Sequence, residues 1–229
     1  LNNLSMGDYS AIVGGSDNSS TNQFSFIGNG SLNIASGQYS AIVGGSSNGS
    51  TGVYSFVGCG SQNVAGKTSS VVAGGTQNRA MGDYSGISSG FNNGTTGDYS
   101  FIGSGSLNQI NSQLSFIGGG NNNYTSASNA VVVGGNTNGA TGTRSFIGCG
   151  LNNRAAGTNS VVVGGSTNGA TGINSFVGGG SQNVAGKNSS VVTGGTQNLA
   201  MGDYSAIVSG SNNGTTGDYS FIGSGSLNQ

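Results

Sequence analysis

The sequence contains no histidine, glutamate, proline or tryptophan, and only 5% of its 229 residues are charged. Histidine is the commonest general base, and it completes most catalytic triads and many zinc sites. Without histidine or glutamate, the abundant serines have no obvious base partner, so we expect the chain not to be an enzyme. We accordingly predict no catalytic, cofactor-binding or metal-ligating residue and no cofactor.

Basic residues are as scarce as acidic ones, five against six, which gives a net charge of −1. They form no stripe or cluster, so we expect neither nucleic acid nor a membrane surface as a partner. The apolar runs, such as residues 130–133, are far too short to span a bilayer. The chain starts and ends in the same phase of a repeat, and we interpret it as a segment of a longer array whose export signal or anchor lies outside.

The sequence does contain a repeat of 15 residues without gaps. If Ser10 is position one, serine recurs there in every coil except at Ala130. Position three is Ile or Val, position six is Gly and position nine is Asn in all 15 coils. So short a fixed period predicts a solenoid in which each coil contacts only its neighbours. We therefore predict a single domain spanning residues 1–229.

Each coil is predicted to hold two short strands. Positions one to five centre on a β-branched residue and precede the turn glycine at position six. Asn at position nine is expected in a second turn, forming a ladder of stacked amides rather than a binding surface. Positions ten to thirteen form the second strand, with a small residue at eleven. The fold class is therefore all-β, a parallel β-roll of 15 coils, and no 3.6-residue period supports a helix.

Positions two and four of the first strand vary together. Phe at position two is always followed by Gly at four, as in Phe26 and Gly28, whereas other coils carry a larger residue at four, as in Ala11 and Val13. Residues two apart on a strand share a face, so we expect both positions to fill the inside of the roll. Position three would then point outward, and its Ile and Val residues would form an apolar stripe that monomers rarely expose. This predicts association with further copies of the chain.

The unit at residues 175–180, followed by Asn183 and Ala185, resembles the head repeat of the YadA-like trimeric autotransporter adhesins. The resemblance implies a left-handed parallel β-roll, a homotrimer packed along a threefold axis through the position-three stripe, and a location on the cell surface. Similar repeats occur in phage and viral fibres. Where that family favours Val-Ala-Ile, this chain alternates Phe-Ile-Gly with Ala-Ile-Val. Cys59 and Cys149, at position five, would share the parity of position three and face the subunit interface.

We therefore expect an extracellular, cell-surface or virion fibre segment that presents a region binding a host-surface glycan or protein. The alternative is a purely structural filament with no ligand on these coils. Ice binding ranks last, because threonine is too irregular to form a flat array. Nearly identical blocks at residues 67–109 and 187–229 fit a fibre whose length matters more than any unique site.

Two further columns have alternative interpretations. The tyrosines at position fifteen suggest either core packing, which we favour, or an aromatic glycan platform. The acidic pairs at position fourteen would stack about 5 Å apart, and we favour solvated surface charges over a cation site. The tyrosines are Tyr9, Tyr39, Tyr54, Tyr84, Tyr99, Tyr204 and Tyr219, and the acidic pairs are Asp83 with Asp98 and Asp203 with Asp218.

Overall fold

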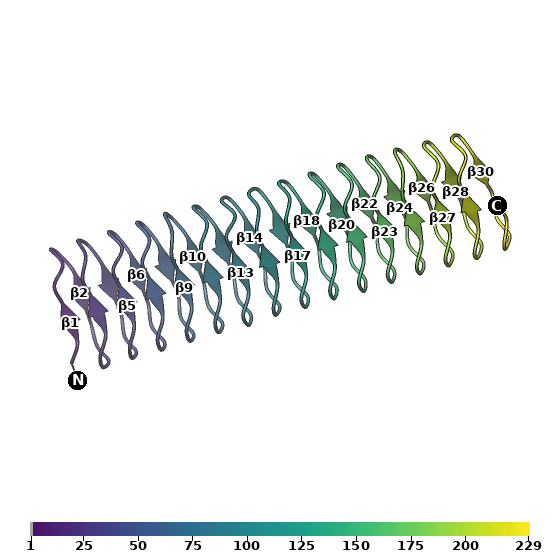
Figure 1. Cartoon of the computed structure of the whole chain (residues 1–229). Coiled ribbons are helices and arrows are strands. Elements are labelled where there is room, and N and C mark those ends of the chain that lie inside the picture. The colour runs from purple at the N-terminus through teal and green to yellow at the C-terminus, as the bar shows by residue number, and fades with distance from the viewer. Residues whose placement is uncertain (1) are drawn as a thin grey trace. The chain divides into compact units, whose positions relative to one another are not determined.

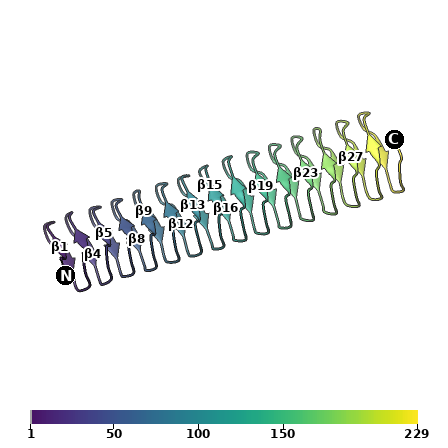
Figure 2. The same ribbon diagram turned by 60° about the horizontal axis from the view of Figure 1, so that its bottom comes forward.

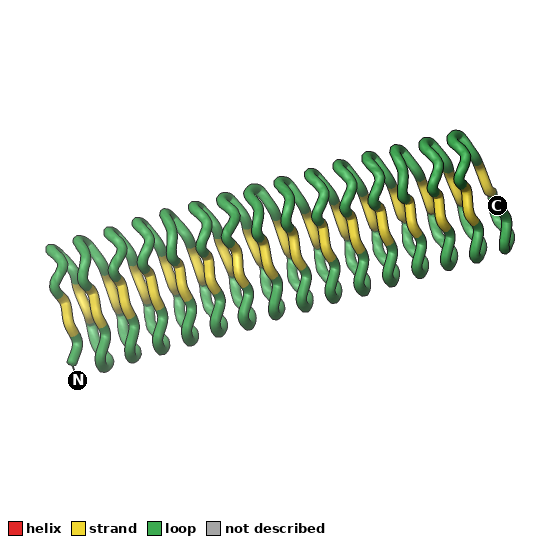
Figure 3. Tube along the Cα trace, in the orientation of Figure 1, coloured by secondary structure: helices red, strands yellow, loops and turns green. Residues whose placement is uncertain are grey.

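A computed structural model describes residues 2–229, and the chain divides into two compact units, Leu1–Leu114 and Ser115–Gln229. In each unit the backbone runs in successive coils, and each coil contributes two short strands linked by turns (Figures 1 and 3). The same succession of coils is visible after rotation (Figure 2). Across residues 2–229 no helix is long and apolar enough to cross a membrane. That all of residues 1–229 form one domain stays a prediction.

The strands are each two residues long, and odd- and even-numbered strands form separate sheets in each unit. In the first unit the odd-numbered strands are β1 (Leu4–Ser5), β3 (Ser19–Ser20), β5 (Ile34–Ala35), β7 (Gly49–Ser50), β9 (Val64–Ala65), β11 (Arg79–Ala80), β13 (Gly94–Thr95) and β15 (Gln109–Ile110). Its even-numbered strands are β2 (Ala11–Ile12), β4 (Phe26–Ile27), β6 (Ala41–Ile42), β8 (Phe56–Val57), β10 (Val71–Val72), β12 (Gly86–Ile87) and β14 (Phe101–Ile102).

The second unit repeats this arrangement. Its even-numbered strands are β16 (Phe116–Ile117), β18 (Val131–Val132), β20 (Phe146–Ile147), β22 (Val161–Val162), β24 (Phe176–Val177), β26 (Val191–Val192), β28 (Ala206–Ile207) and β30 (Phe221–Ile222). Its odd-numbered strands are β17 (Tyr124–Thr125), β19 (Gly139–Ala140), β21 (Arg154–Ala155), β23 (Gly169–Ala170), β25 (Val184–Ala185), β27 (Leu199–Ala200) and β29 (Gly214–Thr215).

Pairing within each sheet is parallel, and each residue lies opposite the residue 15 positions further on. Val57 pairs with Val72 in the first unit, and Val162 pairs with Val177 in the second. The predicted all-β parallel solenoid, with about 15 coils of about 15 residues and two strands per coil, is therefore confirmed. The strands are shorter than predicted, covering positions two and three and positions ten and eleven. The left hand stays a prediction from the resemblance.

The prediction of which residues lie inside the roll was wrong. Side chains at position three, such as Ile27 and Val177, are fully buried within a single chain, whereas Phe26 at position two is 38% exposed. The buried face of the even-numbered strands thus consists of position three, and positions two and four face outward. The stripe expected to pair the subunits of a trimer is instead the core of each coil.

The physical reason is the narrowness of the roll. Opposite position three lies position eleven, which is most often alanine, as at Ala65 and Ala185, and is buried. Serine at position one and asparagine at position nine occupy the remaining interior, as at Ser175 and Asn183. In most coils close packing therefore admits one large aliphatic side chain, although the coil of Ile102 also buries Ile110 at position eleven. The phenylalanines at position two lie on the outer face instead.

Positions two and four lie side by side, but on the outside of the roll. A Cβ placed on Gly28 would lie 3.6 Å from Cε1 of Phe26, and on Gly178 it would lie 3.4 Å from Cε1 of Phe176. Each ring thus extends over the glycine two residues later, along the outer surface of its strand. The same Cβ would lie 2.4 Å from the carbonyl oxygen of Val43 or Thr193 in the next coil, so at these glycines the backbone excludes a side chain more strongly than the ring does.

Three turn positions have a left-handed backbone. Position six is glycine with φ between 84° and 116°, and a Cβ on Gly30 would lie 2.0 Å from the Gly45 carbonyl oxygen. Glycine is therefore required there, as predicted. Positions eight and fifteen are left-handed without glycine, for example Leu32 and Tyr39, both with φ of 57°. The second turn is thus centred one residue before the invariant asparagine.

The asparagine ladder predicted at position nine is confirmed. Asn168 is buried, and its Nδ2 donates to the carbonyl oxygens of Gly164 at 2.9 Å and Gly180 at 3.0 Å. Its Oδ1 accepts from the backbone N–H of Asn183 at 3.0 Å. The side chain thus satisfies backbone groups of its own coil and of the next, which explains why no other residue replaces it.

Serine at position one closes the neighbouring turn. Ser175 Oγ donates to the Gly172 carbonyl oxygen at 2.7 Å, and its backbone N–H donates to the same oxygen at 3.3 Å. In the coil where Ala130 replaces serine, Ser115 of the preceding coil supplies the hydroxyl. Its Oγ donates to the Ala127 carbonyl at 3.1 Å and accepts from the Ala130 N–H at 3.3 Å.

Candidate interaction surfaces

The outer face of the even-numbered strands carries large apolar side chains in both units. Phenylalanine at position two and valine at position four alternate along it, and Val133 and Val163 are about half exposed. The exposed members are Val13, Phe26, Val43, Phe56, Val71 and Phe101 in the first unit, and Phe116, Val133, Val163, Val208 and Phe221 in the second. An apolar row of this kind is typical of a surface that another chain covers.

The aromatic side chains at position fifteen are exposed, so the prediction that they pack in the core was wrong. Tyr54 and Tyr84 are 58% and 54% exposed. Adjacent rings stack nearly parallel, with centroids 4.8 Å apart for Phe24 and Tyr39 and 4.9 Å apart for Tyr39 and Tyr54. Because the left-handed turn directs this position outward, the rings form a ladder along the edge of the roll.

The stacking also bears on the glycan-platform interpretation. Sugar rings pack against the faces of aromatic rings, and within the ladder most faces are covered by the neighbouring ring. In the stacked series Tyr9, Phe24, Tyr39 and Tyr54, the two inner rings have a ring against both faces, whereas each outer ring has a ring against one face. Among the described residues, faces without a stacked ring therefore lie at the ends of each stacked series.

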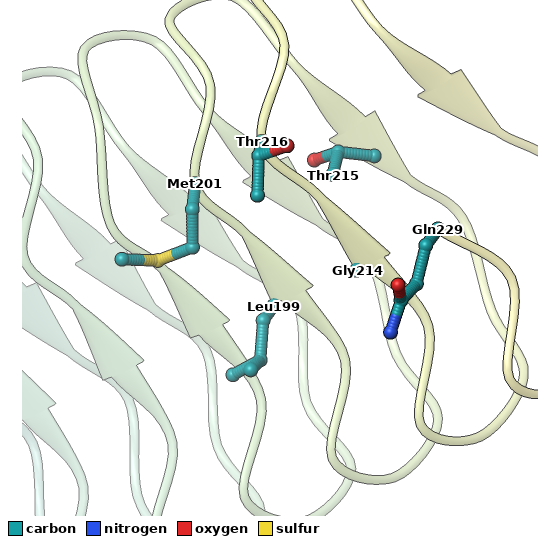
Figure 4. Close-up of a pocket in the computed structure, with 6 residues that line it drawn as sticks. All are labelled: Leu199, Met201, Gly214, Thr215, Thr216 and Gln229. Carbon is teal, nitrogen blue, oxygen red and sulfur yellow. The ribbon is translucent and has the colours of Figure 1, made fainter.

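A hollow of about 350 Å³ in the first unit is lined by Gln62, Gln77, Arg79 and Asn92. Two further hollows lie on the outer face of the odd-numbered strands, one in each unit. Both lie over a glycine at position ten, Gly94 or Gly214, where no atom is within 4 Å of an added Cβ. Figure 4 shows Leu199 and Gln229 on either side of Gly214. The hollow of about 230 Å³ is lined by Arg79, Met81, Gly94, Thr95, Thr96, Gln109 and Asn111, and that of about 260 Å³ by Leu199, Met201, Gly214, Thr215, Thr216 and Gln229.

The two hollows over position ten differ in charge, because Arg79 lines the first and the uncharged Leu199 takes its place in the second. At Gly139 the equivalent space is filled by the chain itself, since an added Cβ would lie 2.3 Å from Cζ of Tyr124. The hollows therefore follow from the absence of a side chain at position ten. They share two threonines and a glutamine, which are Thr95, Thr96 and Gln109 in one and Thr215, Thr216 and Gln229 in the other.

The stacked aspartates hydrogen-bond to the backbone. Asp83 Oδ1 accepts from the Thr68 N–H at 3.0 Å, and Asp98 Oδ1 accepts from the Asp83 N–H at 2.8 Å. The second pair is arranged alike, with Asp203 accepting from the Asn188 N–H at 3.0 Å. Each carboxylate thus satisfies a turn of the preceding coil, a contact that the sequence did not suggest.

The remaining candidates give no assembled chemical site within residues 2–229. These residues contain no group of three or more His, Cys, Asp or Glu side chains placed to hold a metal ion. Cys59 and Cys149 are free thiols on the exposed surface. The argument that placed them at an interface depended on position three facing outward, and it fails with that assignment.

No family model matches the sequence, and no curated protein matches it. The evidence for the fold, a β-solenoid of about 15 short coils, is the strand pairing and the burial pattern.

Proposed function

We propose that the chain is a structural segment of an extracellular, cell-surface or virion fibre, in which copies associate through the outer face of the even-numbered strands. The observation that carries this proposal is the row of exposed Phe and Val residues at positions two and four. The row recurs in each unit with the 15-residue repeat, so a second copy presents a surface of the same period. Self-association gives the row a partner and removes it from water.

The resemblance to the YadA-like head repeat favours a parallel homotrimer as the assembly. A threefold arrangement is closed, and it ends association instead of propagating it sideways. In this proposal the position-three residues stay inside each roll. The rings at position two and the valines at position four pack against the same positions of the neighbouring copies. Full burial of such a side chain contributes about 1.5–3 kcal/mol, and the half-buried ones here contribute less.

Sedimentation of the purified chain tests this proposal. We expect a stable trimer at micromolar concentration. We expect Val133→Asp combined with Val163→Asp to dissociate it, because two charges would enter the apolar interface. Leu199→Asp combined with Ile173→Asp is the matched control, since these residues are similarly exposed but lie off the even-strand face. A folded wild-type monomer, or dissociation by both double variants alike, would contradict the proposed interface.

Adhesion is distinguished from a purely structural role by a separate measurement. Binding of the assembled protein to a glycan array and to host-cell surfaces would support a segment that presents a ligand-binding region. Saturable binding that is retained after every other part of the fibre is removed would locate the ligand on these coils. Absence of binding together with a stable trimer would favour the structural filament.

A further inference from the structure

The aromatic ladder of the first unit is interrupted once. Position fifteen carries Tyr9, Phe24, Tyr39 and Tyr54 in consecutive coils, then Ser69, and then Tyr84 and Tyr99. The rings on each side stack at similar spacings, 4.9 Å for Tyr39 and Tyr54 and 4.9 Å for Tyr84 and Tyr99. Ser69 therefore lies between two stacks of rings, and its own side chain is too small to cover either.

The backbone continues through the interruption without change. Ser69 has φ of 53°, close to 57° at Tyr54 and 56° at Tyr84. Its N–H donates to the Val53 carbonyl oxygen at 2.8 Å, just as the Tyr84 N–H donates to Thr68 at 2.8 Å. Tyr54 and Tyr84 are therefore presented in the same orientation, two coil steps apart, which is about 9.6 Å at the usual strand spacing.

This separation matches the thickness of one additional ring. A planar ring midway between Tyr54 and Tyr84 would lie about 4.8 Å from each centroid, within the range that aromatic pairs prefer. That distance is also the spacing of the ladder's own rings, 4.8 Å for Phe24 and Tyr39. Exposure agrees with an open face, because Tyr39, with a ring on both sides, is 42% exposed, whereas Tyr54 is 58% exposed.

We propose that Tyr54, Ser69 and Tyr84 form an intercalation slot for a single planar aromatic group, either a free aromatic compound or an aromatic side chain of a partner protein. Both tyrosine faces contact the guest, and the Ser69 hydroxyl lies at the base of the slot. The slot is independent of the even-strand face used for self-association.

The second unit provides a natural control. Ser189 precedes Tyr204 and Tyr219, whose rings stack at 5.1 Å, as Ser69 precedes Tyr84 and Tyr99. On its other side, however, position fifteen is Asn174 instead of tyrosine, and Asn174 Oδ1 accepts a hydrogen bond from Asn159 Nδ2. A guest at Ser189 would contact one ring face only, so the slot is expected at Ser69 and not at Ser189.

Indole binding to the full-length chain tests the proposal. The protein has no tryptophan, so indole fluorescence reports the probe alone. We expect saturable binding of one indole per chain, and upfield shifts of the indole proton resonances, because both ring faces would shield a sandwiched guest. Binding without upfield shifts, or with many equivalent sites, would overturn the slot.

Variants separate the slot from other apolar surfaces. Ser69→Tyr fills it with the protein's own ring, and we expect indole affinity to fall at least tenfold while the melting temperature is kept or raised. Tyr54→Ser removes one wall and is expected to weaken binding several-fold. Tyr204→Ser is the matched control and should leave affinity unchanged within about twofold. If the folded Ser69→Tyr variant bound indole with unchanged affinity, that result by itself would overturn the proposal.

A tryptophan-containing tripeptide, Gly-Trp-Gly, identifies the source of the guest. Binding of the peptide with the same dependence on Ser69 and Tyr54 would support an aromatic side chain of a partner protein. Binding of indole without the peptide would support a small aromatic compound in the same slot. Failure of both probes to bind would overturn the slot, and it would leave the proposed self-association unaffected.

Discussion

At the scale of single residues, the buried amide of Asn168 joins its coil to both neighbours. Its backbone N–H donates to Asn153 Oδ1 at 2.9 Å, and its side chain serves the carbonyls of Gly164 and Gly180. No other side chain of this size offers two donors and an acceptor in a neutral group. The same arrangement recurs coil by coil in each unit, so each asparagine connects its own coil to the coils before and after it by hydrogen bonds.

We predict that Asn168→Ala lowers the free energy of unfolding by roughly 1–3 kcal/mol, because buried carbonyl and N–H groups lose their partners. Asn3→Ala should cost less, since Asn3 lies in an exposed coil and its bond to the Gly15 carbonyl is accessible to water. Urea denaturation followed by circular dichroism measures both changes. Equal costs at the two sites would contradict the view that burial makes the ladder strong.

At the scale of the element, most of the two-residue strands bury one side chain and leave the other at least partly exposed. In β20 these are Ile147, fully buried, and Phe146, which is only partly covered. The larger side chain therefore lies outside and the smaller one forms the core. We therefore expect the free energy of unfolding to depend more on the smaller, buried residue at position three than on the larger residue at position two.

We expect Ile147→Ala to cost about 2–5 kcal/mol, the range for truncating a buried aliphatic side chain. Val163→Ala, which truncates an exposed residue at position four, should cost well under half as much in the monomeric state. Thermal unfolding in the Val133→Asp background, which is expected to weaken the proposed interface, compares them. A larger cost for Val163→Ala would reverse the assignment of inner and outer faces.

The pairing of Phe176 with Gly178 gives a separate test on β24. Gly178→Val would place its Cβ 3.4 Å from the Phe176 ring and 2.4 Å from the Thr193 carbonyl oxygen. We expect a cost of about 1–3 kcal/mol, as for other overpacked sites. Adding Phe176→Ala should recover part of it, because the ring yields but the carbonyl remains. A double-mutant cycle with zero coupling energy would show that the two side chains do not compete.

The sequence was sufficient for the repeat, the strand order and the turn glycine, because each leaves an invariant residue at a fixed position. The sequence was misleading about the faces of the first strand. A large Phe26 next to a small Gly28 is the same pattern whether the two residues lie inside or outside the roll. The more informative signal was invariance: position three never varies beyond Ile and Val, as a narrow core requires, whereas position two ranges from Gly86 to Phe101. The gap in the aromatic ladder at Ser69 could not be predicted from the sequence, because the prediction required knowing that position fifteen faces outward.

At the scale of the whole molecule, the repeat makes length adjustable. Within each unit a coil contacts the next through the same parallel register, as between Val162 and Val177. Removing one complete repeat leaves the remaining partners in register, whereas removing part of one shifts every later side chain to the wrong face. Stability should therefore depend on the phase of a deletion more than on its size.

We predict that deletion of residues 160–174 gives a folded chain, because Asn159 then precedes Ser175 as it now precedes Ser160. Deletion of residues 160–167, which is shorter but out of phase, should abolish cooperative unfolding of the second unit. Circular dichroism and limited proteolysis compare the two variants. Equal stability of both would mean that the coils tolerate loss of register.

The direction of the hydrogen bonds between coils has a mechanical consequence. Bonds such as Val161 N–H to the Ser175 carbonyl, at 2.9 Å, link one coil to the next along the stack. Tension applied along the stack peels these bonds one coil at a time instead of shearing them together. Each released coil of 15 residues adds roughly 50 Å of extended chain. A unit pulled from its ends would thus yield in many small, equal steps, and it would lengthen under load where a single cooperative domain would rupture.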